Sequence, residues 1–142
     1  MRSLLDVNVL IALFDADHSL HAQAMEWFGQ NAKSGWASCP LTQNGCIRVM
    51  SHPGYPNSVP VKVMGERLRA AVAHAHHEFW ADDVSALDEA LIDMRRVHGA
   101  KQLTDVYLLA LAVSHGGRFV TFDRSLPSSA VLKAQKKNRV VI

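Results

Sequence analysis

Three aspartates stand where apolar segments of the chain begin or end. Asp6 interrupts the apolar run RSLLDVNVLIALF, Asp105 lies near the start of QLTDVYLLALAVSHG, and Asp123 directly follows RFVTF. A carboxylate removed from water costs several kcal/mol unless a partner compensates its charge. Because carboxylate oxygens are the ligands that Mg²⁺ and Mn²⁺ prefer, a divalent cation would make three such groups tolerable together. The expected chemistry is that of an all-oxygen metal site, provided that the fold gathers these residues.

Strands and helices are predicted to alternate along the whole chain, from the spacing of apolar residues and from Pro and Gly punctuation. Such alternation is typical of an α/β fold. We therefore expect a three-layer α/β/α sandwich around a central, mostly parallel sheet. The predicted strands are 3–7, 35–39, 77–81, 118–122 and 139–142, and the predicted helices are 8–15, 18–33, 40–51, 60–75, 85–97 and 102–116.

This order of elements places the three aspartates at one edge of the predicted sheet. Asp6 and Asp123 each mark the carboxyl end of a strand, which is where ligands sit in such sheets. Asp105 lies in the opening turn of a helix, where the helix dipole favours a carboxylate. Taken singly, Asp105 is an ordinary helix-start residue and Asp123 an ordinary turn residue. The prediction of a site depends on their convergence.

Length and composition predict an ordinary globular protein. The chain has 142 residues, 49% of them hydrophobic and 20% charged, with a net charge of +2, and this length is that of one domain over residues 1–142. No apolar run approaches the roughly 20 residues that span a bilayer, and no signal peptide is recognisable. Cys39 and Cys46 lie about 10 Å apart along a predicted helix, too far for a disulfide, so we expect free thiols. We therefore expect a cytoplasmic protein without a membrane partner.

Four segments together give the chain a family resemblance. LLDVNVLIAL, PLTQNGCIRVMSHPGYPN, HGAKQLTDVYLLALA and FVTFDR occur in the order and spacing of a PIN domain, and the chain specifically resembles the VapC-type toxin ribonucleases of toxin–antitoxin pairs. The resemblance implies a cluster of acids that binds Mg²⁺ or Mn²⁺ and activates water to cleave RNA phosphodiester bonds. Carried over position by position, these catalytic and metal-binding acids are Asp6, Asp105 and Asp123.

One position departs from the family pattern. A Glu usually follows the Thr of the central helix, whereas this chain has Gln43. The Gln43 amide oxygen can accept a hydrogen bond or hold a water molecule, but it brings no charge to neutralise a metal. With three anions, we expect one well-occupied metal ion and a second that binds weakly or only with substrate. A cleavage mechanism that uses two metal ions therefore has less support in this chain.

Three polar residues are predicted to support the acids. Asn8 and Thr104 could orient the carboxylates, a role that often governs metal affinity. Thr121 lies two residues before Asp123, on the same strand face, and could hold a water molecule. Local hydrogen bonds to the backbone explain all three equally well. Arg48 and Arg124 flank the acids and could contact phosphate or pair with the carboxylates.

Other features bear on partners. The basic segment KAQKKNR at 133–139 either meets RNA phosphates or is a solvated face. The resemblance implies a small antitoxin and a homodimer. The apolar stripes at 20–28 and 61–75 are where such contacts would lie, unless the stripes face the core.

The sequence leaves two alternative functions open. A PIN-like module that binds RNA or protein without cleavage is suggested by Gln43. A phosphatase of the haloacid dehalogenase type is suggested by DVNVL, with Asp82 and Asp83 as late acids, although the second Asp and the Thr of that family's motif are absent.

Overall fold

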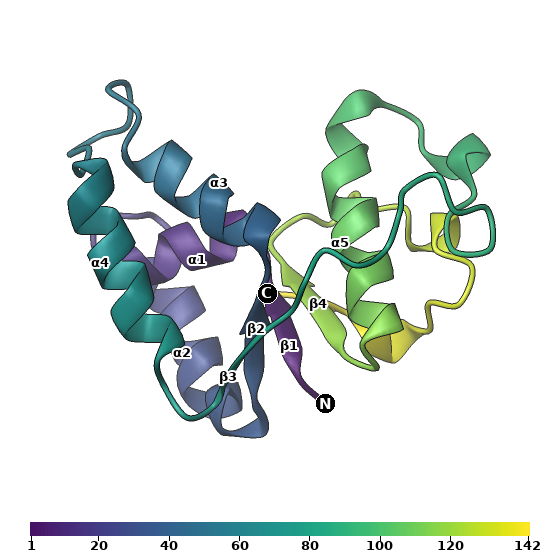
Figure 1. The fold of residues 1–142 in the computed structure, drawn as a ribbon, viewed down its shortest axis with the longest axis horizontal. Coiled ribbons are helices and arrows are strands. Elements are labelled where there is room, and N and C mark those ends of the chain that lie inside the picture. The colour runs from purple at the N-terminus through teal and green to yellow at the C-terminus, as the bar shows by residue number, and fades with distance from the viewer.

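The computed structural model describes residues 1–142 and contains a central five-stranded sheet (Figure 1). The strand order is β3-β2-β1-β4-β5, and every pair of neighbouring strands is parallel. All five predicted strands are present, each shorter than predicted at one or both ends. Their bounds are Ser3–Leu5 (β1), Trp36–Ser38 (β2), His77–Phe79 (β3), Arg118–Thr121 (β4) and Arg139–Val141 (β5).

Helices cover both faces of this sheet. Helices α1 to α4 lie on one side and α5 on the other, which confirms the expected three-layer α/β/α sandwich (Figure 1). No helix is long and apolar enough to cross a bilayer. The α-helices are Val7–Phe14 (α1), His21–Asn31 (α2), Pro40–Met50 (α3), Val61–Val72 (α4) and Leu103–Ser114 (α5), and the 3₁₀ turns are Ala32–Ser34 (η1), Met94–Arg96 (η2), Ala100–Gln102 (η3), Ser128–Ala130 (η4) and Lys136–Asn138 (η5).

The sheet separates two hydrophobic cores. Successive strand residues point to opposite faces, so Leu4 and Phe119 pack with α5, whereas Leu5 and Val120 pack with α1 to α4. All four side chains are fully buried. Burial on both faces explains why the strands are continuous apolar runs rather than alternating ones.

The two apolar stripes mostly face the core rather than solvent. Met64 and Leu68 of α4 are buried, and Trp27 and Phe28 of α2 pack against the same core cluster. Met64 and Leu68 therefore belong to the folded interior, whereas Trp27 and Phe28 are only partly buried and Val61 is exposed.

The predicted helix at 85–97 is wrong. This segment consists of turns, the short η2 and a single antiparallel bridge between Ile92 and Val131. Its side chains hydrogen-bond their own backbone: Ser85 Oγ accepts from the Leu87 amide at 3.1 Å, and Asp88 Oδ1 accepts from the Ala90 amide at 2.9 Å. Such local bonds compete with helix formation.

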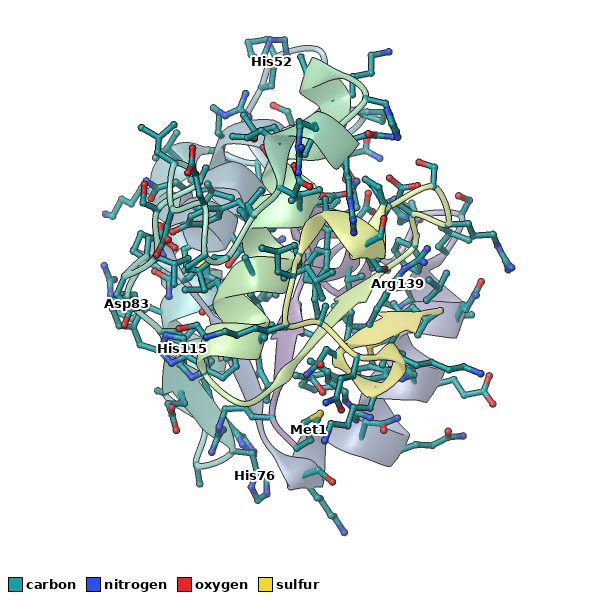
Figure 2. All side chains as sticks on the ribbon, turned by 90° about the vertical axis from the view of Figure 1, so that its right-hand side faces the viewer. Met1, His52, His76, Asp83, His115 and Arg139 are labelled. Atoms are coloured by element: carbon teal, nitrogen blue, oxygen red, sulfur yellow. The ribbon has the colours of Figure 1, made fainter.

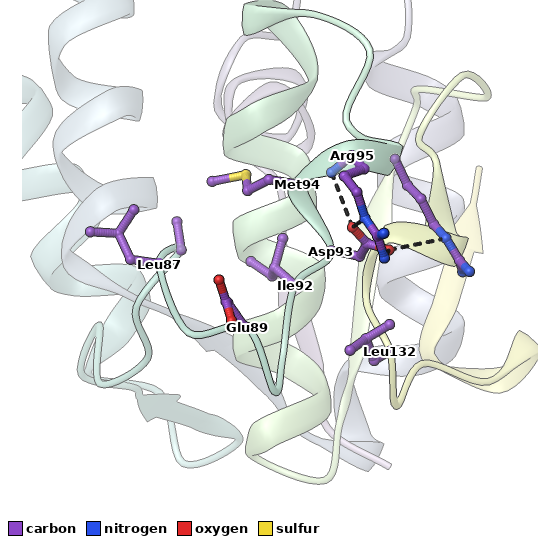
Figure 3. Close-up of a pocket in the computed structure, with 9 residues that line it drawn as sticks. Leu87, Glu89, Ile92, Asp93, Met94, Arg95 and Leu132 are labelled. Atoms are coloured by element: carbon purple, nitrogen blue, oxygen red, sulfur yellow. Dashed lines mark hydrogen bonds and ion pairs between the residues drawn. The ribbon is translucent and has the colours of Figure 1, made fainter.

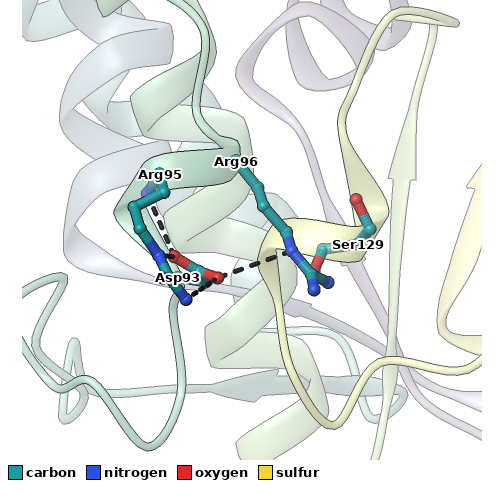
Figure 4. A network of polar contacts seen from close by, with 4 residues as sticks. All are labelled: Asp93, Arg95, Arg96 and Ser129. Atoms are coloured by element: carbon teal, nitrogen blue, oxygen red, sulfur yellow. Dashed lines mark hydrogen bonds and ion pairs between the residues drawn. The ribbon is translucent and has the colours of Figure 1, made fainter.

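Asp93 organises the end of this irregular segment. Its carboxylate accepts from the Arg95 amide and from the Arg95 guanidinium, and it forms an ion pair with Arg96 at 3.4 Å. Arg96 in turn donates to the Ser129 carbonyl at 3.0 Å (Figure 4). The segment is thereby attached to η4 through side chains.

The strand order creates a switch point beside β1. The chain adds β2 and β3 on one side of β1, and then β4 and β5 on the other. At the carboxyl end of β1, the Asp6 amide donates to the Val120 carbonyl at 3.0 Å. Ligands in open α/β sheets bind beyond the strand ends at such a point.

Close packing of α1 against α3 shapes the same end of the sheet. A Cβ atom added to Gly45 of α3 would lie 2.8 Å from Val7 Cγ2, closer than real contacts allow. Only glycine therefore lets α3 approach the start of α1 this closely, directly beside Asp6.

Candidate active site

A cleft of about 600 Å³ opens where α1, α3 and α5 begin. Three helix N-termini meet there, and their unpaired N–H groups and dipoles favour negative charge. The cleft is lined by Asp6, Val7, Asn8, Pro40, Leu41, Asn44, Gly45, Arg48, Asp82, Thr104 and Asp105.

Asp6 is the most deeply placed of the acids, with only 5% of its surface exposed. Burial raises the pKa of its carboxyl group, and the nearby charge of Asp123 also acts in this direction. The opposite influence comes mainly from Thr121, whose hydroxyl donates to Asp6 Oδ2 at 2.8 Å. Asp6 is thus a buried acid with one oxygen satisfied from β4.

Asp105 and Asp123 meet beside Asp6. Burial raises the pKa of Asp105 to about 7, and the charges of Asp6 and Asp123 add to the effect. The pKa of Asp123 is lowered, mainly because the Ser125 hydroxyl and amide each donate to its Oδ1 at 2.7 Å. The two carboxyl groups also interact with each other, which raises the pKa of Asp105 and lowers that of Asp123. The fold therefore brings the three predicted acids together.

Thr121 links two of these acids instead of merely facing the site. Its hydroxyl donates to Asp6 and accepts a hydrogen bond from the Asp123 amide at 3.0 Å. Thr121, which the sequence suggested as a holder of water, therefore contacts both acids directly. Asn8 and Thr104 are both exposed on the cleft wall, and their side chains do not hydrogen-bond a carboxylate.

Gln43 does not line the acidic cleft, contrary to its predicted supporting role. Its Nε2 donates to Ser38 Oγ at 2.9 Å, and Ser38 Oγ lies 2.8 Å from His77 Nε2. Gln43 borders a smaller cavity between α3 and α4 instead. The physical reason is that neighbouring residues of a helix point about 100° apart. The next residue, Asn44, is the one that faces the acids.

Two wall residues were not predicted for this site. Asn44 shares a helix face with Arg48, which was predicted to flank the acids, and this i, i+4 spacing was the available signal. Asp82 follows β3, so the strand-end rule that selected Asp6 would also have found it. Asp82 Oδ2 accepts from the Leu41 amide at 3.2 Å, in the first turn of α3.

Asp83, the residue after Asp82, attaches this loop to the end of α5. Asp83 Oδ1 lies 3.0 Å from His115 Nε2, after the end of α5, and Figure 2 shows the two side chains side by side. The His115 ring also stacks on Trp80, with centroids 4.5 Å apart. The loop after β3 is thereby fixed against α5.

The donor set fits a hard divalent cation. No three His, Cys, Asp or Glu side chains form a closed set of metal ligands, but Mg²⁺ in proteins commonly takes one or two carboxylates and completes its shell with water and substrate phosphate. Burial and the charges of Asp6 and Asp123 raise the pKa of Asp105 to about 7, and a bound cation would offset the crowding of these carboxylates. Asp6 and Asp105 line the same cleft and are the residues placed to hold such an ion.

Another cavity of similar size has no such chemistry. It measures about 610 Å³ and lies against the irregular segment 86–96 (Figure 3). Leu87, Ile92, Met94 and Leu132 give it an apolar lining, and its Asp93 is engaged by Arg95 and Arg96. Three of its charged groups are paired with one another and it holds only one further acid, Glu89, so the acidic cleft is the candidate active site.

Known proteins share both the sequence and the fold of this chain. The model of the PIN domain family matches residues 3–131. Ribonuclease VapC44 of Mycobacterium tuberculosis is 51% identical over 138 residues, which are 97% of each chain. Two solved structures have TM-scores of 0.64: VapC20 of M. tuberculosis, a sarcin–ricin loop cleaving toxin, at 9% identity over 93% of this chain and 98% of that one, and a toxin–antitoxin complex from Klebsiella pneumoniae at 16% identity over 98% and 96%.

These comparisons decide between the families that the sequence suggested. At such low identity the two solved structures support the fold alone, whereas the family match and the identity to VapC44 extend over nearly the whole sequence. The haloacid dehalogenase alternative is therefore wrong, and Asp82 and Asp83 have the structural contacts described above. The strand-end acids, the all-parallel sheet and the relatives agree that the chain belongs to the PIN domain family, within its VapC group.

Proposed function

We propose that this protein is a divalent-metal-dependent endoribonuclease and the toxin of a toxin–antitoxin pair. The observation that carries the proposal is the convergence of Asp6, Asp105 and Asp123 at one end of the sheet, where burial, together with the charges of the other two acids, raises the pKa of Asp105 to about 7. Carboxyl groups that are buried close together resist ionisation, and a bound cation would favour their ionised forms. The 51% identity to a protein named Ribonuclease VapC44 supports RNA as the substrate.

Each acid has a separate role in this proposal. Asp6 and Asp105 would hold Mg²⁺ or Mn²⁺, and Asp123 would act as a further ligand or as an acid that contacts the ion through water. The cation, when bound, offsets charge on the phosphate and makes water a better nucleophile. Thr121 fixes the orientation of Asp6, and Arg48 on the cleft wall contacts a phosphate oxygen.

The alternative of a non-cleaving binding module lost its main support. That alternative rested on Gln43, whose amide replaces a carboxylate. Gln43 lies outside the acidic cleft and is bonded to Ser38, so the cleft keeps its three acids whatever residue stands at this position. We therefore expect cleavage rather than binding alone.

The test combines cleavage with metal binding. Purified protein is incubated with single-stranded RNA in Mn²⁺, in Mg²⁺ and in chelator, and Mn²⁺ binding is measured by calorimetry. Asp6→Asn should lose more than the roughly 10- to 100-fold that removal of an outer metal-site partner costs, and it should weaken Mn²⁺ binding. Glu66→Gln, an exposed acid on α4, is the matched control. Full cleavage by Asp6→Asn would contradict the proposal.

The proposal extends to partners and compartment. We expect a small antitoxin, a homodimer and residence in the cytoplasm, where Cys39 and Cys46 remain the free thiols seen in the structure. Solved toxin–antitoxin complexes of the same fold support the first expectation. Expression without an antitoxin should arrest growth, and light scattering should give twice 15.7 kDa. A protein that does not harm cells when it is expressed alone would contradict the toxin–antitoxin proposal. A monomeric mass would contradict the homodimer.

A further inference from the structure

A second cleft, of about 540 Å³, lies on the other side of the Asp123 loop. Three of its lining residues are cationic and none is acidic. Only Ala134 and Val141 are apolar, and the polar remainder includes two serines and a glutamine. The lining consists of Arg124, Ser128, Ser129, Ala134, Gln135, Lys136, Arg139 and Val141.

The cations of this cleft form no salt bridge with a carboxylate. Arg124, Lys136 and Arg139 form no salt bridge, whereas Arg95 and Arg96 beside the neighbouring apolar cavity are both paired with Asp93. Unpaired cations that face one cleft produce a positive potential that attracts anions.

Arg139 forms the wall between this cleft and the active site. Its Nη2 donates to the Arg124 carbonyl at 2.7 Å and to the Asp123 carbonyl at 3.4 Å, and its buried Nε has no partner. Figure 2 shows Arg139 on the face formed by α5 and the C-terminal segments. Its guanidinium is held by neutral carbonyl oxygens and forms no salt bridge, although its charge helps to lower the pKa of the nearby Asp123 carboxyl group.

Asp123 connects the two clefts. Its carboxyl group contacts Asp105 in the acidic cleft, and its backbone carbonyl accepts from Arg139 in the basic one. A phosphodiester chain that leaves the acids past Asp123 therefore meets Arg124 first, the next residue along the loop.

We infer that the basic cleft binds the phosphate backbone of the RNA strand next to the scissile bond, an inference that rests on the proposed function. Each phosphate needs a cation, and Arg124 and Lys136 are exposed and unpaired. Hydroxyl and amide side chains supply further donors. An acidic protein segment fits less well, because protein partners are held mainly by apolar anchors, and the cleft offers only two small apolar residues.

The test measures how RNA affinity depends on salt. Binding of a fluorescent single-stranded oligonucleotide is followed by anisotropy in chelator, where metal-dependent cleavage does not occur. Each lost phosphate contact lowers the slope of log K against log salt by about 0.7 on single strands. Arg124→Gln/Lys136→Gln should lower it by about 1.4, so that between about 50 and 200 mM salt the wild type loses about sevenfold more affinity than the variant.

Matched variants make the result specific. Lys33→Gln/Arg67→Gln removes the same two charges from exposed positions outside the cleft and should keep the wild-type slope. Lys136→Gln alone, an exposed change without side-chain partners, should lower the slope by about 0.7 and serves if the double variant does not fold.

The outcomes separate this inference from the proposed function. An unchanged slope for Arg124→Gln/Lys136→Gln, or equal losses in the control, would overturn the inference even if the wild type cleaves RNA. Weaker binding of polyglutamate with unchanged RNA binding would also overturn it and would assign the cleft to a protein. A lowered slope in a protein that never cleaves RNA with Mn²⁺ would support the inference and contradict the proposed function.

Discussion

The acidic and basic clefts lie on either side of one loop but are built in different ways. The acids stand at strand ends and in the first turn of a helix, and Asp6 is held by Thr121 from a neighbouring strand. Arg124 and Lys136 stand on the irregular segments and short turns between β4 and β5, and Arg139, the first residue of β5, is held by backbone carbonyls. Reacting groups must be fixed precisely by the sheet, whereas phosphate contacts tolerate more mobile positions.

A change of pH should produce the largest difference between Mn²⁺ binding in the acidic cleft and RNA binding in the basic cleft. Metal binding requires ionised carboxylates, and the pKa of Asp105 is raised to about 7. Mn²⁺ affinity should therefore fall about tenfold for each pH unit below 7, or about 100-fold by pH 5. RNA binding in chelator should change far less. Calorimetry of Mn²⁺ binding and anisotropy of RNA binding over this pH range test the contrast. If both affinities changed with pH in the same way, the two clefts would not differ as proposed.

The raised pKa of Asp105 also makes the stability of the metal-free protein depend on pH. Asp105 has an ordinary pKa of 3.8 in the unfolded chain and about 7 in the folded protein, so the folded state binds more protons between these values. In the metal-free protein, the contribution of Asp105 to the free energy of unfolding is greatest below pH 3.8. This contribution is lost as the pH rises to 7. Asp105→Asn should abolish this part of the pH dependence in thermal unfolding.

Thr121→Val tests whether the acids depend on the sheet. The change removes the donor to Asp6 and the acceptor for the Asp123 amide but keeps the shape of the side chain. We expect a loss of about 10- to 100-fold in Mn²⁺ affinity and cleavage, with the RNA salt dependence in chelator unchanged. Loss of RNA binding as well would mean that the clefts are not independent.

Gly45→Ala should act through packing at the acidic cleft. The added Cβ would lie 2.8 Å from Val7 Cγ2, so α3 must move away from α1, at a cost of about 1–3 kcal/mol in the free energy of unfolding. Denaturant unfolding measures this cost. Gly65→Ala, on α4 with nothing within 4 Å of the new Cβ, is the control and should not destabilise the protein.

Asp82→Asn should have the smallest effect. The Asp82 carboxylate accepts from the Leu41 amide near the start of α3, and an exposed charge at a helix N-terminus contributes about 0.3–1 kcal/mol. We expect a loss of this size in stability and a small change in cleavage. A loss of cleavage as large as that of Asp6→Asn would instead make Asp82 part of the reacting site.

The sequence predicted the sheet and its acids because both depend on strong local signals. Short buried strands are apolar runs, and a carboxylate directly after such a run is unusual enough to identify Asp6. Topology then brings strand ends together, so convergence with Asp123 followed from the order of elements. The free thiols of Cys39 and Cys46 were likewise predicted from their spacing.

The misses have physical causes that sequence spacing does not reveal. Gln43 and Asn44 differ by a rotation of about 100° about the helix axis, and only the packing of α3 on α1 through Gly45 decides which one faces the acids. In the segment 85–97, the apolar spacing favoured a helix, but Ser85, Asp88 and Asp93 formed turns with their own backbone. Arg139 reaches the Asp123 loop from the last strand, a contact that no motif encodes.

The bond between Thr121 and Asp6 joins residues 115 positions apart, which sets the time at which a newly made chain becomes active. Ribosomes add about 5–20 residues per second, so roughly 6–23 s separate the synthesis of the two partners. During this interval β1 has no β4 beside it, and the nascent polypeptide carries its first acid without a functional centre. Premature termination before β4 should therefore yield harmless fragments, so a cell is exposed to an active protein only once translation has passed β4.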